Sequence, residues 1–502
     1  MVIYSFSPFG YEGALVTIEV DLRRGIPATD IVGLADSAVK ESRERMQSAI
    51  RNSGYEYPSE RILISLSPAD LKKEGAGFDL PIALAVLSAK KNFNTSVLVM
   101  GELELSGCVR PVKGIYAALS TASAAGIRYA IIPKNSEKSC PKGVKPIYVD
   151  NLNEAFDALS DIEKDVANGG WIKPQKDESK EFKVEFEDYE GMNLDNVKYL
   201  NDLKFAMAVA VAGKHHLLAY GRPGCGKTTV LQCMPQITPK LSEDEKLSVT
   251  RVWSLAGLMR PDEQFKTIRP FRMPHQTASI EGICGGGASC RPGEISLAHN
   301  GVLFLDEAAE FRSSVLQMLR VPLENHTITL SRAGRSTTFP ANFQLIMATN
   351  PCPCGNYGSK ERICLCSAKS IEQYWKKFSA PLLDRVAIRF DCNQEDKSSE
   401  YSVEDLRRMI SRAYERQYHR QGVTGNQNLS PEEILNYCQI TESGRKWLDK
   451  QTLKFDFSPR NIANILKVAR TLSDMTSEED EAVIGELYLK MAVDLHKHAP
   501  SI

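Results

Sequence analysis

A glycine-rich loop is the part of the sequence best suited to chemistry on phosphates. It reads Gly221, Arg222, Pro223, Gly224, Cys225, Gly226, Lys227, Thr228, and Thr229 follows it. The apolar run at 216–220 suits a buried strand and 229–234 can continue as a helix. In that order the glycines let backbone N–H groups surround a phosphate at a helix N-terminus. We expect Lys227 to reach the β- and γ-phosphates of ATP and Thr228 to bind Mg²⁺.

Two further apolar runs end in polar residues that could complete this site. Residues 302–305 are followed by Asp306 and Glu307, and two carboxylates after an apolar strand are poorly explained by packing. Asp306 would hold Mg²⁺ through water, and Glu307 would orient and deprotonate the attacking water. The run 344–348 leads to Asn350, whose amide could bond the γ-phosphate or simply cap the strand. Together the three motifs predict ATP hydrolysis.

Four cysteines follow the third apolar run. They form two Cys-x-Cys pairs separated by nine residues, at Cys352, Cys354, Cys364 and Cys366. Four thiolates can enclose a tetrahedral structural Zn²⁺ ion, although paired zinc ligands usually stand two or more residues apart. The alternatives are reduced thiols or two labile disulfides. We therefore predict a zinc site here and keep both alternatives open.

Composition limits where the protein works and what it binds. The 502 residues are 42% hydrophobic and 25% charged, with a formal net charge of -1. Such a chain folds into several globular domains and has no overall positive field to draw it onto nucleic acid. No run approaches the roughly 20 apolar residues of a membrane span, and we see no signal peptide. The twelve cysteines are scattered, so we expect a cytoplasmic protein without a membrane partner.

Changes in residue pattern divide the chain into four parts. Residues 1–160 alternate strand-like and helix-like stretches, and 161–194 turn polar and acidic, as in a solvated linker. Residues 195–392 hold the nucleotide motifs in an α/β core, and 393–502 are helical by pattern.

The three nucleotide motifs, in this order, resemble those of the AAA+ ATPases, which have a P-loop α/β core and a helical lid. Residues 381–385 resemble the AAA+ segment that ends in an arginine finger, which implies that Arg385 enters the site of a neighbouring subunit. Residues 458–460 open a helix and resemble the segment with the sensor-2 arginine of the lid, here Arg460. An arginine at a helix end is otherwise usually a solvated cap. The resemblance implies a homo-oligomeric ring, most commonly a hexamer.

Other stretches of the sequence restrict the resemblance to one branch of the AAA+ proteins. Residues 269–275, 285–287 and 291–299 are similar to the magnesium-chelatase-like branch of AAA+ proteins. Within that branch, 350–355 and 364–366 are similar to the YifB family of ComM-like competence helicases. This resemblance covers nearly the whole chain.

The first region resembles a Lon-protease-type domain, with the ribosomal S5 domain 2-like α+β fold, through residues 109–114 and 125–133. A Lon peptidase needs a nucleophilic serine and a lysine that activates it. No serine stands around 74–77, and Tyr116 and Ala118 occupy the positions expected for the lysine. We therefore predict the fold without peptidase activity.

A basic hairpin indicates what the motor could act on. Two β-rich runs at 327–330 and 336–339 flank Arg332, a glycine turn and Arg335. In a ring, such hairpins could line a pore and grip DNA phosphates without reading sequence. Taken alone, a basic hairpin tip is commonly just solvated.

The leading hypothesis is therefore an ATP-driven motor on single-stranded or branched DNA. By resemblance it would be a ring helicase that promotes branch migration in recombination or natural transformation. The alternatives are a chelatase-type motor subunit and an ATPase that remodels proteins.

Overall fold

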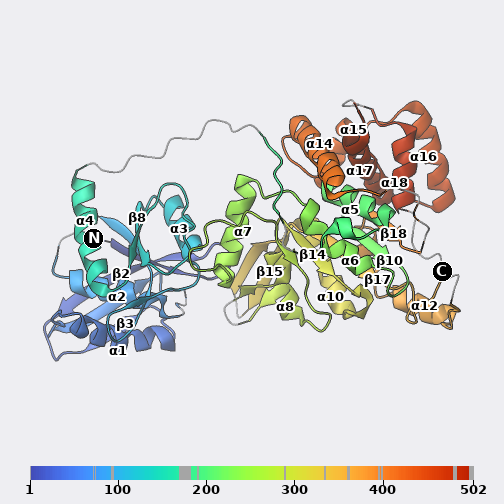
Figure 1. Ribbon diagram of the computed structural model, residues 1–502. Helices are drawn as coiled ribbons and strands as arrows, with labels where there is room; N and C mark the ends of the chain where they lie inside the picture. The colour runs from blue at the N-terminus through green and yellow to red at the C-terminus, as the bar shows by residue number, and fades with distance from the viewer. Residues whose placement is uncertain are drawn as a thin grey trace.

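The computed structural model forms an N-terminal domain, a central domain and a C-terminal helical domain (Figure 1). The structure describes residues 2–69, 71, 73, 75–91, 95–168, 182–188, 191–287, 290–332, 335–358, 362–393, 396, 400–478 and 483–496. None of the helices formed by these residues is long and apolar enough to cross a membrane.

The N-terminal domain is built on a mixed sheet with the strand order β3-β4-β2-β1-β5-β8-β9. The pairs β1–β2 and β2–β4 are antiparallel and the other pairs are parallel. The strands are β1 (Val2–Ser7), β2 (Ala14–Arg23), β3 (Thr29–Val32), β4 (Arg61–Ser67), β5 (Ser96–Val99), β8 (Tyr129–Pro133) and β9 (Lys145–Val149), beside a small hairpin of β6 (Glu102–Leu103) and β7 (Val109–Arg110). Ile62, Ile64 and Leu66 of β4 are all buried, because alternate residues of a strand share one face.

The helices of this domain are α1 (Ser37–Asn52), α2 (Asp79–Ser88), α3 (Ile115–Ala124) and α4 (Leu152–Ala167). Helix α4 begins at Asn151, whose side chain accepts a hydrogen bond from the Glu154 N–H. It buries Leu159 and Ile162 and continues to Ala167, beyond the predicted start of the linker at 161. The charges at its end lie on the solvated face of an amphipathic helix, so they do not stop the helix.

The central domain contains five parallel strands in the order β11-β14-β17-β10-β18. They are β10 (Leu217–Tyr220), β11 (Phe271–Arg272), β14 (Val302–Leu305), β17 (Gln344–Thr349) and β18 (Ile388–Asp391). Every residue of β10, β14 and β17 is buried, as in a parallel sheet covered on both faces. Because the strands are parallel, the loops that follow them meet at one edge of the sheet.

Short elements complete the central domain. The helices are α5 (Asn201–Gly213), α6 (Lys227–Gln232), α7 (Glu243–Ala256), α8 (Ile280–Cys284), α9 (Glu294–Leu297), α10 (Ser313–Met318), α11 (Pro322–Asn325), α12 (Ala368–Trp375) and α13 (Ala380–Leu383). Two hairpins are formed by β12 (Gly285–Gly286) with β13 (Arg291–Pro292), and by β15 (Thr327–Arg332) with β16 (Arg335–Pro340).

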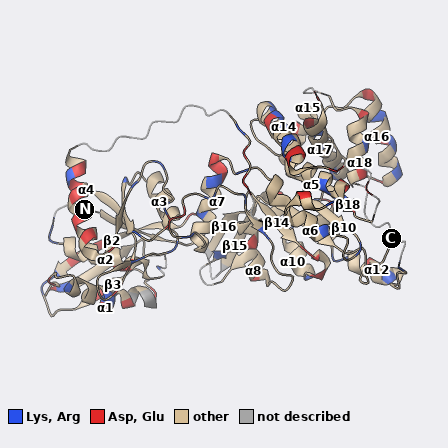
Figure 2. Cartoon of the chain, in the orientation of Figure 1, with Lys and Arg blue, Asp and Glu red and all other residues tan. Residues whose placement is uncertain are grey.

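The helical domain shares a buried core with the central domain. Its helices are α14 (Val403–Gln421), α15 (Pro431–Tyr437), α16 (Glu442–Phe455), α17 (Pro459–Thr476) and α18 (Glu486–His496). Apolar residues of α5, α14 and α17 belong to one cluster. Phe182, within the predicted linker, stacks on Tyr418 of α14 with ring centroids 4.0 Å apart, so this part of the linker packs against the helical domain. Acidic and basic residues are interspersed on helices such as α4 and α14 (Figure 2).

The N-terminal domain docks on helix α7 of the central domain. Arg251 of α7 is 8% exposed and donates hydrogen bonds to the carbonyls of Tyr11 at 2.8 Å and Glu12 at 2.6 Å. Ser254, on the same helix, donates to the carboxylate of Glu137 at 2.5 Å, and burial raises the pKa of that carboxyl group. Apolar residues of both domains also belong to one buried cluster. Polar and apolar contacts therefore fix the docking together.

Candidate nucleotide-binding site

The three sequence motifs meet at the carboxyl edge of the central sheet. The Gly221 N–H donates to the Thr349 carbonyl at 3.3 Å, which joins the glycine-rich loop to the end of β17. The Thr228 hydroxyl donates to Asp306 Oδ1 at 2.9 Å, which joins the start of α6 to the end of β14. Asn350, directly after Thr349, is half-buried at the same edge. Oxygen atoms from two motifs thus converge, as a small hard cation such as Mg²⁺ requires.

Lys227 lies inside the loop that it is expected to serve. It begins α6, two residues before the predicted start, because Gly226 with φ of 95° forms the N-cap. The Lys227 side chain is buried, and Nζ donates to the carbonyls of Gly221 at 2.7 Å and Arg222 at 2.9 Å. The Arg222 N–H in turn donates to Asn393 Oδ1 at 3.0 Å. Binding a phosphate requires Lys227 to exchange these carbonyls for phosphate oxygens.

An aromatic side chain covers part of the loop. A Cβ atom on Gly226 would lie 2.4 Å from Cε2 of Tyr199, a residue that is 49% exposed. This ring offers a face on which a nucleotide base can stack. Tyr199 belongs to no motif, so sequence reasoning did not identify it. Thr229, predicted from its position, lies half-buried in the first turn of α6.

Glu307 has the position and backbone expected of a functional residue. Its φ of 49° is in the left-handed region, which is uncommon for residues other than glycine and concentrated at functional sites. Its N–H donates to Asp306 Oδ1 at 3.0 Å and its side chain is exposed. The carboxylate of Glu307 can therefore reach a water molecule, while Asp306 is held by the backbone and by Thr228.

The two arginines predicted from family position share one carboxylate. Arg385, 8% exposed, donates to the carboxylate of Glu324 and to the Pro381 carbonyl. Nη2 of Arg460, in the first turn of α17, lies 3.6 Å from Glu324 Oε1. The hydrogen bond from Arg385 lowers the pKa of Glu324. Arg385 and Arg460 therefore form one cluster with Glu324. Glu324 is an isolated acid in a four-residue helix, and no pattern in the sequence indicated it.

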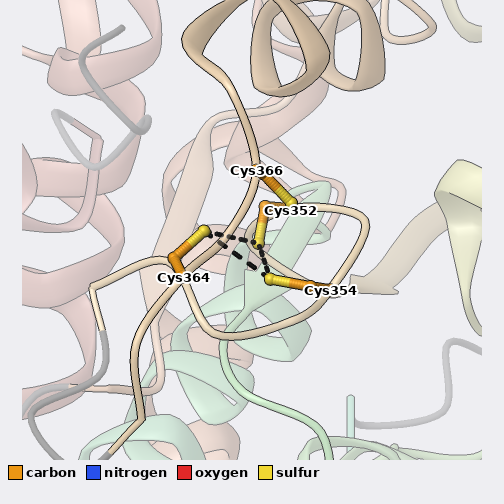
Figure 3. Close-up of side chains that lie close together, drawn as sticks. All are labelled: Cys352, Cys354, Cys364 and Cys366. Atoms are coloured by element: carbon orange, nitrogen blue, oxygen red, sulfur yellow. Dashed lines mark hydrogen bonds between the residues drawn. The ribbon is translucent and has the colours of Figure 1, made fainter.

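The four predicted zinc ligands converge in space (Figure 3). The Sγ atoms of Cys352, Cys354, Cys364 and Cys366 all lie within 4.8 Å of one another. Cys352 Sγ is 3.4 Å from Cys354 Sγ and 3.7 Å from Cys364 Sγ. Four sulfurs placed tetrahedrally at about 2.3 Å from Zn²⁺ would be about 3.8 Å apart. The thiols are free cysteines, and their arrangement fits a zinc ion.

The cysteine segment also contacts the glycine-rich loop. Gly355 has φ of 77°, and a Cβ atom there would lie 2.5 Å from the Pro223 ring. Trp375 of α12 donates from Nε1 to the Pro351 carbonyl at 3.0 Å. The segment is thus packed between α12 and the phosphate-binding loop.

The predicted hairpin is present as β15 and β16, with Arg332 opposite Arg335 in the register. The side chains of both arginines, and the turn at 333–334, lie outside what the structure describes. At the base of the hairpin, Phe339 is buried and contacts the ring of Tyr11 of the N-terminal domain, with centroids 6.4 Å apart.

The positions expected for a Lon-type lysine lie in the core of the N-terminal domain. Tyr116 and Ala118 of α3 are both buried, and burial raises the pKa of the Tyr116 phenol to about 12. A cavity of about 630 Å³ between the N-terminal and central domains is lined by residues that include Gly77, Lys113 and Glu137. The absence of peptidase activity remains a prediction.

Comparison with known proteins identifies the class. Residues 193–400 match the family described as magnesium chelatase, subunit ChlI, and 18–136 and 400–495 match two further ChlI families. The competence protein ComM of Haemophilus influenzae is 35% identical over 491 residues, covering 95% of this chain and 94% of its own. The uncharacterized protein YifB of Escherichia coli is 35% identical over 507 residues, covering 98% and 96%. Lon protease of Solibacter usitatus is 27% identical over 160 residues, covering 29% of this chain and 20% of its own.

The fold, the nucleotide motifs and these matches define a magnesium-chelatase-like AAA+ protein. Within that class, the chain belongs to the YifB/ComM family.

Proposed function

We propose that this protein hydrolyses ATP and uses the energy to move on DNA. The observation that carries the ATPase part is the contact between Thr228 and Asp306 at 2.9 Å, which joins two motifs into one site. Thr228 and Asp306 would hold Mg²⁺, which would neutralise charge on the phosphates. Lys227 would bind the β- and γ-phosphates, Glu307 would accept a proton from the attacking water, and Asn350 would orient that water.

Completion of the site is proposed to need a second subunit. Arg385 and Arg460 share the carboxylate of Glu324; Arg385 would leave it to reach a neighbour's γ-phosphate, and Arg460 would act as the sensor-2 arginine of the lid. An arginine supplied in trans stabilises the charge of the transition state. This arrangement requires a neighbouring subunit, and we propose that the subunits form a hexameric ring.

DNA as the object of the motor is supported by a relative's name and by the hairpin. The Haemophilus influenzae relative is named a competence protein, and Arg332 and Arg335 flank the turn of β15 and β16. The net charge of -1 leaves DNA binding to such local basic groups. We propose branch migration during recombination as the activity of the ring.

The proposal is tested by ATPase and strand-movement assays with single-stranded, forked and four-way DNA. DNA should stimulate ATP turnover, and the double variant Arg332→Ala, Arg335→Ala should lose stimulation while keeping its basal turnover. Lys198→Ala, which removes an exposed lysine paired with Glu400, is the matched control. A rate of ATP turnover that is unchanged by each of the three DNA substrates would exclude the DNA motor.

The second candidate is a chelatase-type motor subunit, favoured by the ChlI family matches. A motor of that kind would respond to a partner protein that inserts metal into a porphyrin, and not to DNA. Stimulation by protein clients alone would instead indicate a remodelling ATPase. The same turnover assay therefore separates a DNA motor from the two candidates that act on proteins.

We further propose that the four cysteines bind one structural Zn²⁺. Its support is the convergence of their Sγ atoms within 4.8 Å. Through Gly355 and Pro223 the metal would stiffen the segment that packs on the phosphate-binding loop.

A further inference from the structure

A pair of thiols lies beside the phosphate-binding loop. Cys225 is a partly exposed member of the loop, and Cys392, directly after β18, is 5% exposed. Strands β10 and β18 are neighbours in the sheet, so the residues that follow them meet. The Cys392 N–H donates to the Tyr220 carbonyl at 2.8 Å, and a Cβ atom on Gly221 would lie 2.8 Å from Cys392 Cβ. The sheet therefore places two cysteines of distant sequence together at the loop.

The two thiols are chemically different. Their side chains are hydrogen-bonded to each other, and Lys227 Nζ lies 3.6 Å from Cys225 Sγ. The hydrogen bond from Cys392, helped by the charge of Lys227, lowers the pKa of Cys225 to about 6. Burial raises the pKa of Cys392 well above its usual value. Cys225 thus has the character of an attacking thiolate and Cys392 that of a resolving thiol.

We propose that Cys225 and Cys392 form a redox switch, in which hydrogen peroxide joins them in a disulfide that closes the loop to ATP. The Cys225 thiolate attacks one oxygen of the peroxide, the O–O bond breaks, and the departing hydroxide takes up a proton to form water. The Cys392 thiol then attacks the resulting sulfenic sulfur. The S–S bond forms, the S–O bond breaks, and the departing hydroxide leaves with the thiol proton as a second water.

The disulfide would prevent the opening of the loop that phosphate binding requires. Lys227 Nζ is bonded to the carbonyls of Gly221 and Arg222, and these bonds must open for a phosphate to enter. In the sequence, Cys225 lies between Gly221 and Arg222 on one side and Lys227 on the other. A bond from Cys225 to the buried end of β18 would hold the loop in its closed form. This inference rests on the proposed nucleotide site.

The test measures binding of a fluorescent ATP analogue with Mg²⁺ to the full chain, together with peptide mass mapping. The protein is first reduced with dithiothreitol and then exposed to hydrogen peroxide. We expect the reduced protein to bind, and oxidation to link the peptides of Cys225 and Cys392 and weaken binding at least tenfold, reversibly. A linked pair with unchanged binding, or lost binding with both thiols intact, overturns the switch. Failure of the reduced protein to bind would instead contradict the proposed function.

A variant isolates the resolving cysteine. In Cys392→Ser the Cys225 sulfenic acid has no partner and proceeds to sulfinic acid, which dithiothreitol does not reduce. The reduced variant should bind the analogue within twofold of wild type, and less than half of that binding should return after peroxide and dithiothreitol. Wild type and the matched control Cys233→Ser, which alters a buried cysteine directly after α6, should recover fully. Equal recovery in all three proteins would overturn the role of Cys392.

Discussion

Lys227 and Glu307 divide the proposed chemistry between nucleotide binding and hydrolysis. Lys227 is buried among loop carbonyls, so its ammonium is already placed where negative charge would be bound. Glu307 is exposed at the end of β14 and can contact a water molecule. We therefore propose that Lys227 binds the nucleotide and that Glu307 takes part in the hydrolysis step.

Two substitutions separate these roles. Lys227→Ala should remove most ATP binding and all turnover, because the phosphates lose their cation. Glu307→Gln should bind ATP normally and lower turnover about 10²–10⁴-fold, because the general base is lost. Equilibrium binding and phosphate release measure the two effects. Glu310→Gln, an exposed acid nearby, is the control, and wild-type turnover in Glu307→Gln would refute the assignment.

We expect the central domain to be sensitive to acid, because two buried histidines directly precede strand β10. Burial lowers the pKa of His215 to about 4 and that of His216 to about 3. His216 Nδ1 accepts a hydrogen bond from the Leu345 N–H at 3.0 Å, which a protonated ring could not accept. Below a pH of about 6.5 both histidines bind protons in the unfolded chain but stay neutral in the folded chain. The free energy of unfolding therefore falls as the pH falls.

The contribution of His215 and His216 to the free energy of unfolding should be nearly constant above pH 7. Between pH 6.5 and about 4 it should fall by up to roughly 1.4 kcal/mol per pH unit for each histidine. Urea unfolding at several pH values measures this slope. His216→Gln should flatten the slope even if it lowers stability at neutral pH, whereas His275→Gln, at an exposed site, should not. An unchanged slope in His216→Gln would contradict the prediction.

The cysteine segment is the second element whose behaviour can be tested. Cys364→Ser should reduce bound zinc from about one ion per chain to near zero, because a structural site uses all four ligands. Elemental analysis and thiol titration measure this. Cys438→Ser, at a buried cysteine of the helical domain, should keep its zinc. Wild-type protein without zinc and with all four thiols titratable would exclude the site.

The assembly of subunits decides whether the site is complete. Arg385→Ala should abolish turnover and leave nucleotide binding largely intact, since the finger is proposed to act in trans. Mixing Arg385→Ala with Lys227→Ala protein should restore part of the turnover, because some interfaces then combine an intact loop with an intact finger. Turnover of each variant alone is the control. A mixture shown to co-assemble that stays inactive would contradict action in trans.

Docking of the N-terminal domain can be tested through Arg251. Arg251→Ala removes the hydrogen bonds to the Tyr11 and Glu12 carbonyls and should weaken docking by about 2–3 kcal/mol. A larger radius of gyration in small-angle scattering and faster limited proteolysis would show the weaker docking. Lys246→Ala, which breaks an ion pair within the same helix at 3.0 Å from Glu243, should leave both readouts unchanged. Unaltered readouts in Arg251→Ala would show that apolar contacts suffice.

The sequence by itself predicted the nucleotide loop and the polar ends of two further strands. It could do so because apolar runs followed by the glycine-rich loop, by Asp306 and by Asn350 are local patterns, and parallel strands bring their ends to one edge. Helix boundaries were less predictable, as α4 shows by continuing to Ala167. There the charged residues from 161 onward lie within the helix and do not end it.

Only the tertiary structure decided which distant residues lie around the site. Glu324 between Arg385 and Arg460, Tyr199 over the loop, and Cys392 beside Cys225 all depend on how separate segments pack. None of these contacts follows from spacing along the chain, because each depends on sheet order and on the shapes of side chains in the assembled core. The sequence therefore determined the local machinery for phosphate, and packing determined which residues surround it.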